Sequence, residues 1–175
     1  MSASDFNTDL AMSDSPEVAD SIEAACRAYF GKELLAVHKA HKTNDKLGVD
    51  FWLEFSGKME ALDVKIRRFD YSLRGDSRTC CLELMSNIGT GKPGWSTDPS
   101  KLTDWILFHY LESGLSVIYS ARQLRSAVNG QLPELRKFGK PAVQATKSGS
   151  SSYQSESLFV SHRELGAAIY RNANR

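Results

Sequence analysis

The sequence has few cysteines, no long apolar run and almost no net charge. Three cysteines in 175 residues, two of them adjacent at Cys80 and Cys81, make a poor disulfide framework, so a reduced, cytoplasmic setting is expected. No run of about 18 apolar residues occurs, and therefore no transmembrane helix is predicted. The first residues, MSASDFNTDLAMSDSPE, have neither the basic start nor the apolar stretch of a secretory signal.

Several common catalytic motifs are also missing. The stretch GTGKPG lacks the spacing of a phosphate-binding P-loop, because Ser86 stands where that motif needs glycine. His38 and His41 have no matching Cys/His pair that would complete a zinc site. No G-x-S-x-G occurs, which argues against a serine hydrolase built on a nucleophile elbow.

The small net charge of +1 is unevenly distributed. Residues 1–31 carry a net charge of −5, which leaves +6 on residues 32–175. Because residues 1–15 are rich in Ser and Asp and show no periodicity, we interpret them as a disordered acidic arm, followed by a single domain over residues 16–175. A basic body behind an acidic arm fits nucleic-acid contact only weakly, and on charge alone an ordinary solvated surface with a disordered acidic tail is favoured.

The hydrophobic pattern predicts an α/β domain with a central mixed sheet flanked by helices. Ser15-Pro16 predicts a helix start, and apolar residues at helical spacing extend this helix towards His41. Alternation predicts a β-hairpin of residues 47–55 and 59–69, with the next strand, 79–86, beside it. A Ser-rich loop or hairpin tip is expected at 147–157. The remaining predicted elements are strands at 103–112, 115–120 and 158–160 and helices at 121–138 and 162–173.

The phase of the predicted hairpin brings three charged residues together. Asp50 falls on the polar face of the first strand, and Asp63 and Lys65 fall on the polar face of the second. Two neighbouring carboxylates repel each other unless a cation joins them, and hard oxygen ligands with room for water suit Mg²⁺. A lysine beside such a site can orient a water or stabilise the charge that grows on a phosphate. The alternative is an exposed cross-strand charge ladder that only stabilises the hairpin.

These residues resemble the PD-(D/E)XK, or restriction-endonuclease-like, nuclease superfamily. Gly48-Val49-Asp50, then twelve residues, then Asp63-Val64-Lys65 is similar to its motif, with Val49 in place of the proline. The resemblance covers roughly residues 17–128 and implies an αβββαβ core. It also implies an acidic residue on the first helix, for which Glu23 is the candidate and Glu33 its competitor.

The resemblance further implies a DNA endonuclease that depends on Mg²⁺, for which Mn²⁺ can substitute. It also implies that the protein acts as a homodimer, in the cytoplasm of a bacterial or phage-infected cell. Asp50, Asp63, the backbone carbonyl of Val64 and Glu23 would bind the metal, and Lys65 would orient the attacking water. The alternative function is a catalytically silent nuclease fold that acts as a binding module or inhibitor, and a plain accessory protein is the third possibility.

A further set of basic and aromatic residues is predicted to contact nucleic acid. Trp95 lies in an irregular loop and is a candidate for stacking on a base, although a lone tryptophan more often caps a core. Glu83 alternates with Cys81 and Met85 and is either a further acid of the site or the partner of an arginine. The predicted nucleic-acid contacts are Lys42, Lys46, Arg67, Arg68 and Trp95.

Overall fold

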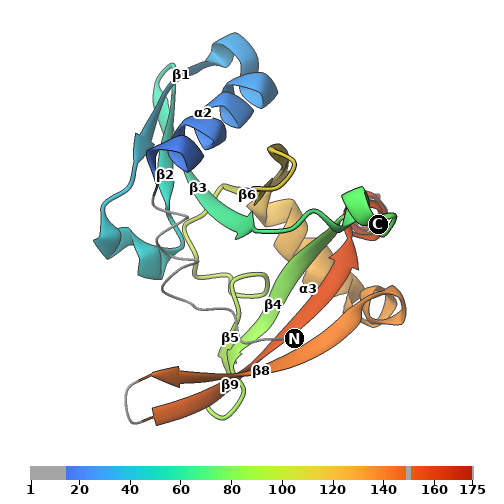
Figure 1. Ribbon diagram of the computed structural model, residues 1–175. Helices are drawn as coiled ribbons and strands as arrows, with labels where there is room; N and C mark the ends of the chain where they lie inside the picture. Colours follow the sequence, from blue (N-terminus) through green and yellow to red (C-terminus); the bar gives the residue numbers. More distant parts are fainter. Residues whose placement is uncertain (1–14, 149–150, 175) are drawn as a thin grey trace.

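The computed structural model describes residues 15–148 and 151–174, so the predicted acidic arm lies, except for Ser15, outside the described residues. The described part contains a five-stranded mixed sheet, a second sheet of four strands and three α-helices, which confirms the predicted α/β class (Figure 1). None of these helices is long and apolar enough to cross a membrane.

The first helix, α2 (Pro16–Phe30), begins where the sequence predicts. Ser15 caps it by accepting a hydrogen bond from the backbone N–H of Val18, and Pro16 fits the first turn because it needs no backbone donor there. The helix ends at Gly31, whose φ of 62° is rarely adopted by other residues. Its buried side chains recur at four-residue spacing: Val18, Ile22 and Cys26.

The predicted continuation of this helix towards His41 is wrong. Residues Leu34–Lys39 form strand β1, which pairs antiparallel with β2 (Phe51–Phe55). Leu34 and Val37 are three residues apart and therefore also fit a helical stripe, but the chain turns at Gly31 and its backbone groups pair with β2 instead.

The first sheet has the strand order β1-β2-β3-β6-β7. The predicted hairpin is confirmed: β2 pairs antiparallel with β3 (Lys58–Arg67), with Phe51 opposite Leu62. Strand β3 pairs parallel with β6 (Trp105–Tyr110), and β6 pairs antiparallel with β7 (Leu115–Ser120).

The second sheet has the order β5-β4-β9-β8, and the sequence predicts only part of it. Residues 79–86 do form a strand, β4 (Thr79–Asn87), but it pairs with β5 (Lys92–Pro93) and β9 (Ser151–Ser161) rather than beside the hairpin. Strand β8 (Lys140–Ser148) and β9 form a long antiparallel hairpin that projects from the body of the molecule (Figure 1). The predicted strand 158–160 is part of β9, and the described residues of the predicted Ser-rich loop or hairpin tip, 147–157, lie in β8 and β9.

The connection between the parallel strands β3 and β6 differs from the order that the resemblance implies. Residues 68–104 run through a 3-10 turn (Tyr71–Arg74), β4 and β5, and contain no α-helix. Helix α3 (Ala121–Phe138) follows β7 instead and has the predicted bounds, as does α4 (His162–Ala173).

The two faces of the first sheet are covered differently. Helix α2 packs on one face in a core that includes Leu62 of β3 and Leu107 of β6. The other face, which includes Phe108 of β6, packs with α3, α4 and the second sheet. Because side chains alternate along a strand, Asp63 and Lys65 of β3 lie on this second face.

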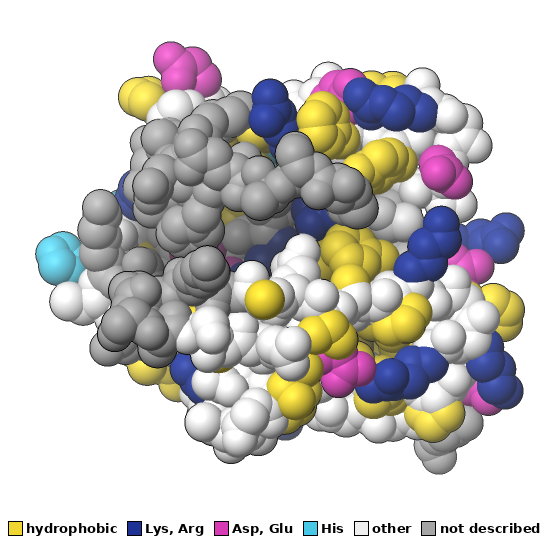
Figure 2. All heavy atoms as spheres, turned by 60° about the horizontal axis from the view of Figure 1, so that its bottom comes forward, with side chains coloured by type: hydrophobic (Ala, Val, Ile, Leu, Met, Phe, Trp, Pro, Cys, Tyr) yellow, Lys and Arg dark blue, Asp and Glu magenta, His cyan; other side chains and the backbone are white. Residues whose placement is uncertain are grey.

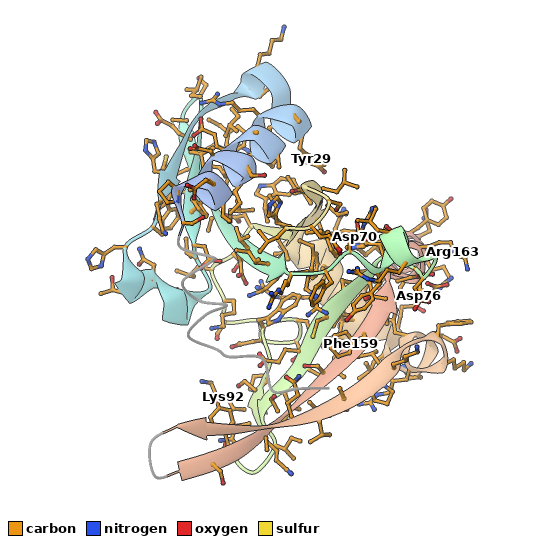
Figure 3. The ribbon with its side chains drawn as sticks, in the orientation of Figure 1. Tyr29, Asp70, Asp76, Lys92, Phe159 and Arg163 are labelled. Atoms are coloured by element: carbon orange, nitrogen blue, oxygen red, sulfur yellow. The ribbon has the colours of Figure 1, made fainter. Side chains whose placement is uncertain are left out.

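A buried aspartate ties the connection to both sheets. Asp70 has no exposed surface, and its Oδ2 accepts hydrogen bonds from Nε and Nη2 of Arg78, at 2.9 and 2.7 Å, and from Oγ of Ser113 at 2.7 Å. Its Oδ1 accepts from the backbone N–H and the hydroxyl of Ser72. Arg78 directly precedes β4, and Ser113 lies in the turn between β6 and β7, so one carboxylate joins the two sheets (Figure 3).

His162, the first residue of α4, makes a second junction between the sheets. Its Nε2 is hydrogen-bonded to the hydroxyl of Tyr110, which donates to the carbonyl of Thr79, and its Nδ1 accepts from the hydroxyl of Tyr119 at 2.7 Å. Burial lowers the pKa of His162 to about 4, so the imidazole is neutral at pH 7.

Candidate active site

Asp50 is held at the start of β2 by backbone hydrogen bonds on both sides. Its N–H donates to the carbonyl of Leu62 on β3 at 2.9 Å, and its carbonyl accepts from the N–H of Ala40, which follows β1, at 2.8 Å. Its side-chain Oδ2 accepts the N–H of Val64 at 2.7 Å. Asp50 thus directly precedes β2, which begins at Phe51, and its carboxylate is fixed against the middle of β3.

The backbone before Asp50 is pinned close to Asp63. Gly48 has a φ of 73°, and its carbonyl accepts a hydrogen bond from the hydroxyl of Thr103 at 2.6 Å. A Cβ atom at Gly48 would lie 3.7 Å from Oδ2 of Asp63, so the Gly48-Val49-Asp50 segment passes directly beside that oxygen. Glycine is favoured here by its backbone conformation, and a Cβ atom would also lie only 3.0 Å from Oγ1 of Thr103.

Asp63 and Lys65 meet on the face of β3 that Asp50 approaches. Nζ of Lys65 lies 2.6 Å from Oδ1 of Asp63. Asp63 is only 2% exposed, and its Oδ2 has no hydrogen-bond partner among the described residues. A buried carboxylate oxygen without a partner is costly, so this oxygen marks a position where a cation or a proton would stabilise the protein.

The charge balance at the pair indicates the same position. The pKa of Asp50 is raised to about 6, chiefly by burial and also by the neighbouring carboxylate of Asp63, while the N–H of Val64 and the charge of Lys65 act in the opposite direction. The buried guanidinium of Arg125 on α3 also adds positive charge near Asp63, and its Nη2 has no partner among the described residues. The repulsion between the two neighbouring carboxylates is therefore a second reason to expect a proton or a cation beside them.

The donor set fits a hard divalent cation that retains water. The carbonyl of Leu62 and the N–H of Val64 both point towards β2, so the carbonyl of Val64 lies on the same side of β3 as the Asp50 carboxylate. Two carboxylates, one backbone oxygen and several waters are ligands that Mg²⁺ accepts. The described side chains contain no cluster of three or more His, Cys, Asp or Glu residues, so further ligands would be water or substrate oxygens.

The structure does not bring Glu23 to this pair. Its carboxylate is 42% exposed and lies 2.8 Å from Arg27, one turn further along α2. Helix α2 covers the face of the sheet opposite Asp63, which explains the separation. The competitor, Glu33, contributes charge near Lys58, at the turn of the β2–β3 hairpin and away from Asp50.

The predicted nucleic-acid contacts are spread over different surroundings. Arg67 lies over the ring of Phe159 on β9, at 5.2 Å, and Arg68 lies over the ring of Phe69 on the connection, at 5.3 Å. Figure 3 labels Phe159 on the second sheet, so Arg67 bridges from β3 to that sheet. The side chains of Lys42 and Lys46 lie outside the described part.

Trp95 is only partly buried and packs on the core rather than standing free. Its ring meets Phe108 edge to face, with centroids 6.0 Å apart, and Nζ of Lys65 lies 4.9 Å from its centroid. Glu83 accepts a hydrogen bond from the backbone N–H of Trp95 at 3.3 Å, so it holds the Trp95 loop in place.

In Figure 2, Lys and Arg side chains are visible within the hollowed middle of the face that is drawn.

Sequence reasoning missed Arg125 as a member of this site. It is 8% exposed, and its Nη1 and Nε donate to the carbonyls of Thr103 and Trp95. A detectable signal exists, because Arg125 stands within the apolar stripe of α3 beside Leu124 and Val128. A charged residue on a buried helical face usually has a specific partner.

No protein-family model, curated protein or solved structure matches this chain.

Proposed function

We propose that this protein is a metal-dependent phosphodiesterase that hydrolyses DNA. The observation that carries the proposal is the buried Oδ2 of Asp63, which has no hydrogen-bond partner among the described residues. The Asp63 side chain lies near the Asp50 carboxylate, and its other oxygen, Oδ1, is 2.6 Å from Nζ of Lys65. Asp50, Asp63 and the carbonyl of Val64 would hold Mg²⁺ or Mn²⁺. The bound ion would supply positive charge to the phosphate and lower the pKa of a water.

The residues of the chain have separate roles in this reaction. A water attacks phosphorus in line with the leaving oxygen, so a new P–O bond forms as the bond to that oxygen breaks. The Lys65 ammonium donates hydrogen bonds that orient this water or the phosphate oxygens. Arg67 adds positive charge on the same face of β3 and would hold a flanking phosphate. One site cuts one strand, and we therefore expect a homodimer to cut both.

A catalytically silent nuclease fold is the second candidate. The separation of Glu23 from the aspartate pair favours it, because the acidic set is then smaller than the resemblance implies. Such a protein would bind nucleic acid, or an enzyme that acts on it, without cutting.

The test is cleavage of supercoiled, linear and branched DNA in the presence of Mg²⁺ or Mn²⁺, compared with an excess of chelator. We expect cutting that requires the metal and that falls at least about 100-fold in Lys65→Ala, as is typical of losing one transition-state donor. Lys58→Ala is the matched control, since Lys58 lies on the same strand but is paired with Glu60 far from Asp50. DNA binding without cleavage by the wild type would instead support the silent fold.

A further inference from the structure

The ammonium group of Lys65 is held from two sides. It lies 2.6 Å from Oδ1 of Asp63 and 4.9 Å from the centroid of the Trp95 ring. The Lys65 side chain is 26% exposed, so part of the ammonium's hydration is replaced by these two contacts. A cation over the face of an indole is attracted to the negative face of the ring.

The backbone of Trp95 is held by hydrogen bonds at both its N–H and its carbonyl. Its N–H donates to Oε2 of Glu83 at 3.3 Å, and its carbonyl accepts from Nε of Arg125 at 3.1 Å. The edge-to-face contact with Phe108 of β6 fixes the ring on the same face of the sheet as Lys65. Trp95 therefore presents a rigid surface to the ammonium.

The residue before it also shows that the loop is tightly seated. The N–H of Gly94 donates to the carbonyl of Leu84 at 2.9 Å. A Cβ atom at Gly94 would lie 2.1 Å from the carbonyl oxygen of Glu83, which no side chain tolerates without a shift of the backbone. The position of Trp95 is thus fixed by contacts with β4 on one side and α3 on the other.

We propose that Trp95 is the positioning residue that keeps the Lys65 ammonium in place when a cation occupies Asp50 and Asp63. This inference rests on the proposed function, and it differs from a role of Trp95 in stacking on bases. A cation on the Asp63 carboxylate weakens the attraction between Asp63 and Lys65, because the two positive charges then compete for one carboxylate. The indole face carries no charge that the cation neutralises, so it continues to hold Lys65 beside the reacting phosphate.

The experiment compares Trp95→Leu and Trp95→Phe with the wild type, using NMR of the Lys65 Hε protons and steady-state cleavage of DNA. In the wild type we expect an upfield ring-current shift of the Lys65 Hε protons that persists when Mg²⁺ is added. Trp95→Leu should lose this shift and lower kcat about 2- to 30-fold with KM nearly unchanged, which corresponds to the usual strength of a cation–π contact. Trp95→Phe should restore most of both signals.

Phe55→Leu is the matched control, since it removes the ring beneath another lysine, Lys58, at 5.2 Å on the far end of the hairpin. It should leave the Lys65 signals and kcat unchanged. A rise in KM with unchanged kcat in Trp95→Leu would overturn the proposal and assign Trp95 to nucleic-acid contact. A ring-current shift that is absent, or that vanishes with Mg²⁺, would overturn it even if the wild type cuts no DNA, whereas a persistent shift in an inactive protein would contradict only the proposed function.

Discussion

Replacing Asp63 by asparagine is expected to lower metal-dependent DNA hydrolysis at least about 1,000-fold, because the loss of a charged metal ligand removes several kcal/mol of transition-state stabilisation. Asparagine has nearly the same shape, and its carbonyl oxygen can still accept from Lys65, so the folded structure should persist. The measurement is the initial rate of cleavage at saturating Mg²⁺, together with the thermal unfolding curve of the metal-free protein.

Glu60→Gln is the matched control for this substitution. Glu60 lies on the same strand as Asp63 and accepts a hydrogen bond from Nε1 of Trp105 at 2.6 Å, which glutamine can also accept. We expect Glu60→Gln to retain the wild-type rate. Equal rates for Asp63→Asn and the wild type would show that the aspartate pair is not the hydrolytic site.

Replacing Asp70 by asparagine is expected to destabilise the protein by about 3–5 kcal/mol, the usual cost of removing one partner of a buried ion pair. The five hydrogen bonds that its two oxygens accept come from Arg78, Ser113 and Ser72, and an amide cannot accept all of them. For a chain of 175 residues this corresponds to a fall in Tm of about 6–20 °C, measured by calorimetry or circular dichroism.

The pH dependence of this contribution has a definite sign. The hydrogen bond from Arg78 is the largest of the effects that hold the pKa of Asp70 well below its usual range. The stabilisation that Asp70 contributes is therefore present above the unfolded pKa of about 4 and is lost only as pH falls below that value.

Glu112→Gln is the control for Asp70→Asn, because the neighbouring Arg74–Glu112 pair is solvent-exposed and should contribute less than about 1 kcal/mol. Equal stabilities of Asp70→Asn and Glu112→Gln would contradict the role of Asp70 as the junction of the two sheets.

The sequence predicts the central hairpin and its charged face well, since both depend on local alternation. The alternation of Leu62, Val64 and Ile66 with Asp63 and Lys65 sets which face each side chain occupies. The turn at Gly57, where φ is 80°, then sets the register of the hairpin, in which Phe51 pairs with Leu62 and Asp50 therefore lies next to Asp63. The bounds of α3 and α4 are equally local, because each begins at a serine cap.

Features that depend on distant pairing could not be predicted in the same way. The strand Leu34–Lys39 has an apolar spacing that suits a helix as well as a strand, and only its pairing with β2 decides between them. Likewise, β4 has a clear strand pattern, but nothing local tells that it pairs with β9, more than seventy residues away. Glu23 is a candidate only because the resemblance implies an acidic residue on the first helix, and the side of the sheet that α2 covers is a tertiary property.

The central claim is that Asp50 and Asp63 together bind a divalent cation, and calorimetric titration of Mn²⁺ into the metal-free protein tests it most directly. At pH 7.5 we expect binding of about one ion per chain, since the donor set is that of a single hard cation. Because the pKa of Asp50 is raised to about 6, its proton competes with the ion, and the affinity should fall by about tenfold per pH unit below that value. Asp63→Asn should abolish the binding, and Glu60→Gln should leave it unchanged. Absence of binding by the wild type at pH 7.5, or binding that survives in Asp63→Asn, would contradict the account.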